Sequence, residues 1–142
     1  MEKLEKSRTI TKRALNTLEQ SFVLAKQAEN EKRPEYVILA QDSMVKHFEY
    51  SYDTFWKFLK IFLEQKMDIT SDEIKSPKSV FRLCVHLNLC SPQEGETLIQ
   101  MVNDRNITTH SYDIQQVHKI IPCIKEYYVC MLKIIEHIES KL

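Results

Sequence analysis

The longest periodic stretch of the chain covers residues 34–63, PEYVILAQDSMVKHFEYSYDTFWKFLKIFL, and it decides the fold. Mostly apolar residues return in it at steps of three and four, which places them on one face of an α-helix. They are Val37, Gln41, Met44, Phe48, Tyr52, Phe55, Leu59 and Phe62, with Val45, Trp56 and Leu63 beside them. No glycine or proline occurs between Pro34 and Pro77. The pattern predicts a helix of about thirty residues, or roughly 45 Å, beginning at Pro34.

Similar stripes on both sides of this stretch predict two more long helices. From Leu4 to Ala28, apolar or small residues again return at helical spacing. A third stripe runs from Val117 to Ile138, after Asp113 and Gln116, whose side chains are spaced to cap the start of a helix. Pro122 lies inside this last segment and should bend it, because proline removes one backbone hydrogen bond.

Two shorter helices are predicted between the long ones. The polar residues 68–73 form a connection with at most one helical turn. Ser76-Pro77 and Ser91-Pro92 each combine a serine N-cap with a proline in the first helical position, and Glu94 completes a capping box with Ser91. The predicted ranges are Pro77 to Leu89 and Pro92 to Asp104.

The composition limits the fold further. The chain has 142 residues, of which 43% are hydrophobic, so residues 1–142 are expected to form a single domain with one core. One glycine and four prolines supply few of the tight turns that a β-sandwich or a doubly wound sheet requires. The only glycine, Gly95, excludes the glycine-rich phosphate loops of P-loop and Rossmann proteins. We therefore predict an all-α fold, an antiparallel up-and-down bundle of four or five helices.

Charge and cysteine usage exclude several classes of function. Twenty basic and twenty acidic residues cancel, so the whole chain is not attracted to nucleic acid or to a membrane. No apolar run approaches the roughly twenty residues that span a bilayer, and the charged first residues do not resemble a signal peptide, so we expect a cytoplasmic protein. Cys84, His86 and Cys90 lack a second cluster that would complete a zinc site, and no C-x-x-C pair occurs. We predict reduced thiols, no metal and no cofactor.

The segment NDRNITTHSYD, residues 103–113, carries the residues best suited to chemistry. Its β-branched and short polar residues are poor helix formers between two good helices. Arg105 offers a planar cation suited to phosphate, His110 can transfer a proton near neutral pH, and Tyr112 presents a hydroxyl. Together they suit metal-free phosphodiester chemistry. The same residues could instead satisfy backbone groups at a helix junction, with Arg105 paired to Asp104 or Asp113, and spacing alone favours that interpretation.

Arg105, His110 and Tyr112 resemble the R-x4-H-x-Y form of the motif that defines the HEPN superfamily, the higher eukaryotes and prokaryotes nucleotide-binding domains. The chain from about Asp42 to Asp113 resembles the nucleotidyltransferase substrate-binding protein family within it. The matching segments are Phe48-Glu49, Trp56-Lys57, Leu59-Lys60, Ser76-Pro77, Phe81-Arg82, and Met101 before Asp104-Arg105-Asn106. Leu98 stands where many relatives have tryptophan, a difference that touches no proposed chemical role.

The resemblance implies a HEPN-like bundle of the HepT-like toxin type. Such toxins form homodimers that join two motifs in a cleft and cut RNA without metal, leaving a 2′,3′-cyclic phosphate. Carried onto this sequence, Arg105 would bind the scissile phosphate, His110 would transfer protons and Asn106 would position neighbouring groups. Tyr112 would be the residue that the partner, a minimal nucleotidyltransferase acting as antitoxin, blocks by attaching AMP.

Two hypotheses therefore remain compatible with the sequence. The first is an endoribonuclease toxin inhibited by a nucleotidyltransferase. The second is a non-catalytic substrate-binding or regulatory subunit of that nucleotidyltransferase. Because the net charge is zero, RNA would have to be held by local cations, for which Lys57, Lys60 and Arg82 are candidates, although basic residues on helices are more often simply solvated.

Overall fold

The computed structural model describes residues 2–142, and within them it contains helices and no strand, as the periodicity predicts. The elements are α1 (Glu2–Asn30), α2 (Pro34–Lys66), η1 (Ser71–Glu73, a single 3-10 turn), α3 (Pro77–His86), α4 (Pro92–His110) and α5 (Ile114–Glu139). The all-α prediction is confirmed. None of the helices in residues 2–142 is both long enough and apolar enough to cross a membrane.

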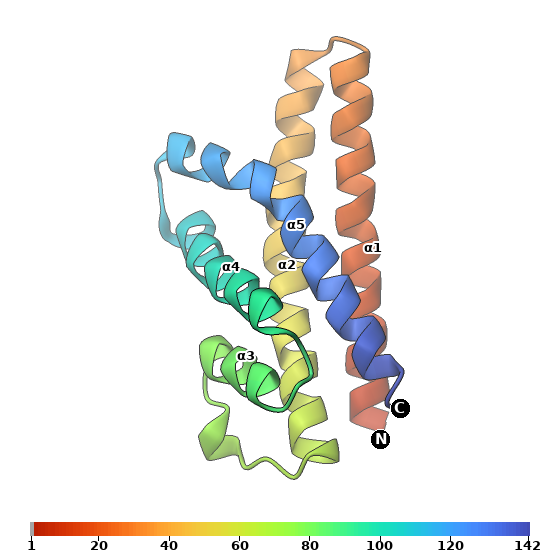
Figure 1. Cartoon of the computed structure of the whole chain (residues 1–142). Helices are drawn as coiled ribbons and strands as arrows, with labels where there is room; N and C mark the ends of the chain where they lie inside the picture. Colours follow the sequence, from red (N-terminus) through yellow and green to blue (C-terminus); the bar gives the residue numbers. More distant parts are fainter. Residues whose placement is uncertain (1) are drawn as a thin grey trace.

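Helices α1 and α2 form a long antiparallel hairpin against which the rest of the chain packs (Figure 1). Helix α5 runs across this hairpin, and the short helix α3 and helix α4 cover the side of α2 that α1 leaves free (Figure 1). The two ends of the chain lie at the same end of the bundle, while the closed end of the α1–α2 hairpin extends beyond the other helices (Figure 1).

The core follows the stripe that residues 34–63 predict. Phe48, Phe55, Phe58, Leu59 and Leu63 on α2 are completely buried. Buried apolar residues of all five helices join this stripe in one continuous cluster. Helix α2 can bury such a wide face because it has neighbours on several sides, which a helix at the edge of a bundle lacks.

Helix α3 is shorter than predicted, since it ends at His86 and not at Leu89. Asn88 adopts a positive φ of 58°, a left-handed conformation that asparagine tolerates better than most residues. This conformation turns the chain so that the Leu89 N–H donates to the Cys84 carbonyl at 2.8 Å. The apolar pattern continues through Leu89, which is buried, but the backbone has already left the helix.

The start and the bend of α5 are close to the prediction. Asp113 caps the helix by accepting a hydrogen bond from the Gln115 N–H at 2.9 Å. Gln116 does not complete a capping box, because its side chain accepts from the Ser111 hydroxyl instead. Pro122 lies inside the helix, and Figure 1 shows α5 changing direction after its first turns, as expected where a backbone hydrogen bond is missing.

The only glycine of the chain serves helix packing. Gly95 is buried in α4, and a Cβ atom added there would lie 2.4 Å from the Cγ2 atom of Val85 on α3. Such a distance is far inside van der Waals contact, so α3 and α4 can approach this closely only because residue 95 has no side chain.

Three cysteine thiols are buried: Cys84 on α3, Cys90 just before α4 and Cys130 on α5. Burial raises the pKa of each thiol.

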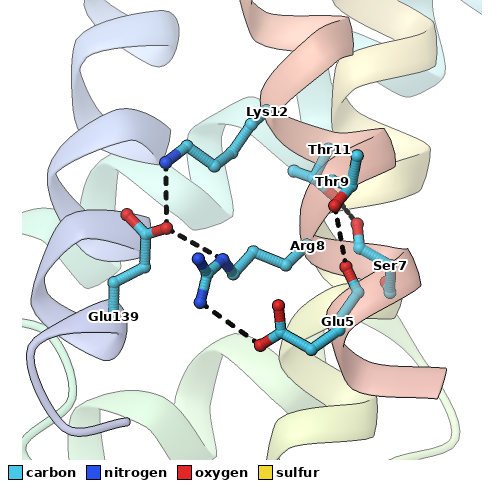
Figure 2. A network of polar contacts seen from close by, with 7 residues as sticks. All are labelled: Glu5, Ser7, Arg8, Thr9, Thr11, Lys12 and Glu139. Carbon is cyan, nitrogen blue, oxygen red and sulfur yellow. Dashed lines mark hydrogen bonds and ion pairs between the residues drawn. The ribbon is translucent and has the colours of Figure 1, made fainter. Parts of the chain in front are cut away.

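A network of charged side chains ties the first turns of α1 to the end of α5 (Figure 2). Glu139 accepts from Arg8 Nε at 3.0 Å and from Lys12 Nζ at 2.9 Å, and Arg8 also reaches Glu5 at 3.3 Å. The Glu139 side chain is 19% exposed, so water screens these pairs less than it screens fully exposed ones. The network closes the end of the bundle where both termini lie (Figure 2).

We expect Glu139→Gln to lower the free energy of unfolding by about 1 kcal/mol, because one carboxylate serves two cations and is mostly shielded from water. Urea denaturation at low salt measures the loss, and high salt should reduce it. Asp72→Asn is the matched control, since Asp72 meets Lys75 only at 3.8 Å with both side chains exposed. Equal losses in the two variants would contradict this assignment.

Candidate functional site

The segment that carries the candidate residues is helical for more of its length than predicted. Helix α4 was expected to end at Asp104 but continues to His110, so Arg105 and the next five residues lie on its last turns. The poor helix formers Ile107, Thr108 and Thr109 are therefore held in a helix by contacts with other helices, which outweigh local propensity. Helix α2 provides these contacts.

Arg105 is attached to α2. Its Nη2 atom lies 3.1 Å from the Asp53 Oδ1 atom, and its guanidinium carbon lies 5.1 Å from the centre of the Tyr52 ring. The Arg105 side chain is 24% exposed, and its Nε atom is buried without a hydrogen-bond partner among the described residues. The helix-junction interpretation pairs Arg105 with Asp104 or Asp113, but its ion-pair partner is Asp53. The guanidinium is held through Nη2, and its other N–H groups have no acceptor among residues 2–142.

One turn further along α4, two hydroxyls meet a single carboxylate of α2. The Glu49 Oε2 atom lies 2.6 Å from Thr109 Oγ1 and 3.0 Å from Thr108 Oγ1. Thr108 Oγ1 also lies 2.9 Å from the Arg105 carbonyl oxygen, so its proton is shared between two acceptors. Glu49 is half-buried in this position.

Asp104, next to Arg105, attaches α4 to α5. It is buried, it accepts a hydrogen bond from the Tyr127 hydroxyl, and it accepts another from Gln100 at 3.1 Å. The Tyr127 ring stacks on Phe48 with 5.6 Å between ring centres. Burial, together with the hydrogen bond to Asp104 and its charge, raises the pKa of Tyr127 above its usual value. Tyr127 therefore stays neutral and remains a donor.

The other motif residues lie on the open side of α4. At about 100° per residue, His110 is about 140° around the helix from Arg105 but only about 40° from Asn106. Asn106 and His110 are both exposed, and Tyr112, beyond the end of the helix, is fully exposed. One chain thus places the imidazole, the amide and the phenol at an open helix end, and places the arginine on a different face of α4, against α2.

The candidate RNA-binding cations do not take part in the contacts that hold α4 against α2. Lys57 and Arg82 are exposed, Lys60 is half-buried, and none of the three forms an ion pair with any residue in the range 2–142. Lys57 lies one turn beyond Asp53 on α2, next along the helix from the Arg105 contact. Within residues 2–142 no cluster of histidine, cysteine or carboxylate side chains is arranged to hold a metal ion.

Sequence reasoning missed the two carboxylates that hold α4. In the sequence, Glu49 stands only within a segment that matches the family, and no motif includes Asp53. The available signal was spacing: Glu49 and Asp53 are four residues apart, and so are Arg105 and Thr109. Two acceptors one turn apart on one helix can pair with two donors one turn apart on another. This spacing predicts the two contacts only when the helices are known to be neighbours.

Comparison with known proteins gives one family and several related structures. The family described as nucleotidyltransferase substrate binding protein like matches residues 8–140. A search of curated proteins found no match. A protein from Thermus thermophilus has a similar crystal structure, with 26% sequence identity and a TM-score of 0.72, covering 89% of this chain and 96% of that one.

Two other similar structures are toxins solved with their antitoxins. A tri-AMPylated HEPN toxin of Shewanella oneidensis, in complex with an MNT antitoxin, is 18% identical with a TM-score of 0.70, and 96% of each chain is covered. A mutant of the MntA-HpeT toxin–antitoxin pair is 16% identical with a TM-score of 0.73, and 99% of each chain is covered. At these identities the likeness establishes a shared fold, the five-helix fold of HEPN toxins.

We expect Tyr127→Phe to lower the free energy of unfolding at neutral pH by about 1–3 kcal/mol, because Asp104 stays buried with one donor fewer. The wild-type contribution is fully present below the ordinary tyrosine pKa of 10.0 and is lost as pH rises through the raised pKa of the folded state. The variant should therefore lose stability less steeply above pH 10.0.

Urea denaturation between neutral and alkaline pH measures both effects. Tyr50→Phe is the matched control, because the Tyr50 side chain is exposed and should alter neither quantity. A Tyr127→Phe variant as stable as wild type at neutral pH would contradict the role given to this hydrogen bond.

Proposed function

Because the chain belongs to the nucleotidyltransferase substrate binding protein like family of the HEPN superfamily, we propose that it is a metal-independent endoribonuclease toxin, silenced by a cognate minimal nucleotidyltransferase. The observation that carries the proposal is the end of helix α4. There an anchored guanidinium, an exposed imidazole and an exposed phenol lie within eight residues of one another, Arg105 to Tyr112. These groups suit RNA cleavage followed by control through modification.

The proposed reaction breaks a phosphodiester bond by internal attack. The ribose 2′-oxygen forms a bond to the adjacent phosphorus, the bond from phosphorus to the 5′-oxygen breaks, and the products are a 2′,3′-cyclic phosphate and a free 5′-hydroxyl. His110 takes the proton from the 2′-hydroxyl, and the resulting imidazolium or a water molecule gives a proton to the leaving 5′-oxygen. Arg105 neutralises the charge that develops on the phosphate oxygens. The need for a 2′-hydroxyl selects RNA over DNA.

A second copy of the chain would complete this site. Helical geometry separates Arg105 from His110 by about 140° around α4, so one helix end does not present both to the same phosphate. We propose that a homodimer brings two helix ends together, so that the arginine of one copy and the histidine of the other face a shared cleft. Lys57, Lys60 and Arg82, which have no ion-pair partner in residues 2–142, would guide the RNA strand toward it.

The partner would act on Tyr112. Its phenol oxygen attacks the α-phosphorus of ATP, the new P–O bond forms, pyrophosphate leaves and the phenol proton passes to a base. Complete exposure of Tyr112 beyond the end of α4 leaves its oxygen accessible to another enzyme. The attached AMP would add negative charge and bulk beside His110, where the RNA phosphate has to lie. The tri-AMPylated state of the similar Shewanella toxin is consistent with this form of control.

One observation favours the second candidate, a non-catalytic substrate-binding or regulatory subunit of a nucleotidyltransferase. Arg105 already has an anionic partner, Asp53, at 3.1 Å, so a phosphate has to share the guanidinium with a carboxylate. An arginine whose single role is to pair with Asp53 would serve only to hold α4 against α2. Nuclease assays distinguish the two candidates because only the toxin requires His110.

We expect the purified protein to cleave RNA in the presence of a metal chelator and to leave 2′,3′-cyclic phosphate ends. His110→Ala should reduce the rate by about 10²–10⁴-fold, the usual contribution of a positioned acid or base. His86→Ala is the matched control, since His86 is an exposed histidine at the end of α3. Intact RNA with the wild-type protein, or equal rates for His110→Ala and wild type, would favour the regulatory subunit.

We expect co-expression with the cognate nucleotidyltransferase to add AMP to Tyr112, detected by mass spectrometry of peptides. Tyr112→Phe should remove that modification and leave the toxin active in the presence of its partner, whereas Tyr50→Phe, at another exposed tyrosine, should behave as wild type. An active partner that leaves Tyr112 unmodified would reject the proposed switch.

A further inference from the structure

Two side-chain contacts, one turn apart and called rungs, connect α2 with the end of α4. Glu49 and Asp53 lie one turn apart on α2, and they meet Thr109 and Arg105, which lie one turn apart on α4. The two helices run in opposite directions here, since the lower-numbered residue of α2 meets the higher-numbered residue of α4. The Asp53 rung holds the arginine, and the Glu49 rung holds the turn that ends at His110.

The last turn of α4 needs this second rung. Ile107, Thr108 and Thr109 are three consecutive β-branched residues, each a poor helix former, and no glycine follows to cap the helix. The final backbone bond runs from the Ser111 N–H to the Ile107 carbonyl at 2.8 Å. Local sequence alone predicts an end near Asp104, so the extra turns depend on contacts made by their side chains.

The contact between Glu49 and the two threonines depends on hydrogen bonds and not on attraction between the carboxylate and the helix end. A carboxylate beside the C-terminal end of a helix is unfavourable, because the helix dipole is negative there. Glu49 is nevertheless held there, with Thr109 Oγ1 at 2.6 Å and Thr108 Oγ1 at 3.0 Å. A hydroxyl that donates to an ionised carboxylate forms a shorter and stronger bond than a neutral pair, which offsets the unfavourable dipole.

We propose that Glu49 is a positioning residue for the RNA cleavage proposed above: by binding Thr109 and Thr108 it keeps the last turn of α4 helical and so fixes the position of His110 at the end of that helix. The inference rests on the proposed function for its catalytic consequence, whereas the clamp, meaning the contact of Glu49 with Thr108 and Thr109, concerns only the fold. Glu49 acts through the threonines and the backbone and does not touch RNA.

Amide hydrogen exchange tests the clamp without any enzyme assay. Glu49→Ala should speed exchange at the His110 and Ser111 amides by about tenfold or more and leave the core of α4 protected, because only the last turn loses its support. Thr109→Val removes the shorter of the two bonds to Glu49 but keeps the Glu49 charge and the shape of the side chain, and it should speed exchange at the same amides, by less because Thr108 still contacts Glu49. The double variant should be no worse than Glu49→Ala alone, since Glu49→Ala already removes the contacts with both threonines.

Three variants serve as controls. Thr97→Val alters a threonine of the same helix whose hydroxyl bonds only to the Gln93 carbonyl, and Asp42→Ala removes an exposed carboxylate from α2. Both should match wild type. Glu49→Gln keeps one oxygen that can accept from Thr109 and should restore much of the protection. Unchanged exchange in both Glu49→Ala and Thr109→Val would overturn the clamp.

RNA cleavage then tests the catalytic consequence. Thr109→Val should lower kcat by about tenfold or more and change KM little, because it displaces the proton-transfer group and leaves the charges that bind RNA in place. Faster exchange with an unchanged kcat would overturn the positioning role. If wild type itself cleaves no RNA, the proposed function and that role fall together, whereas the exchange result still decides whether the clamp exists.

Discussion

Helix α4 is fixed by two adjacent side chains that point to different helices. Asp104 is buried against the Tyr127 hydroxyl of α5, and Arg105, about 100° further around the helix, meets Asp53 of α2. Together the two contacts determine both the rotation of α4 about its axis and its position along α2. The two contacts set the course of α4 toward Tyr112, and the Glu49 contact with Thr109 then supports its last turn, so this pair is the constraint on which the candidate site depends.

The constraint divides the site into a fixed part and an open part. Arg105 is held on its α2 side by an ion pair and by the face of the Tyr52 ring, and burial raises the pKa of Tyr52 to about 12, so this ring stays neutral beneath the cation. His110 and Tyr112 lie in the open part, exposed at the end of the helix. A rigid cation beside accessible groups suits both a phosphate substrate and an enzyme that modifies the tyrosine.

The electrostatics of the site are compatible with both candidate functions. Asp53 pairs with Arg105 at 3.1 Å, and Glu49, one turn away on α2, contacts Thr109 of the same helix end. Under the proposed function, an RNA strand would interact with Arg105 only through the donors that Asp53 leaves free, and Lys57 is the next cation along α2. A nuclease can use such an arrangement to orient its arginine, and a regulatory subunit can use it merely to fix a helix.

Periodicity, caps and breakers act over a few neighbouring residues, so the amino-acid sequence is sufficient to specify the helices and their buried faces. The stripe of residues 34–63, the serine caps at Ser76 and Ser91 and the start of α5 after Asp113 are all present as predicted. Only the tertiary structure decided the end of α4 and the partners of Arg105. A carboxylate more than fifty residues away extends the helix through Thr109, and no local pattern in either segment specifies that the two helices meet.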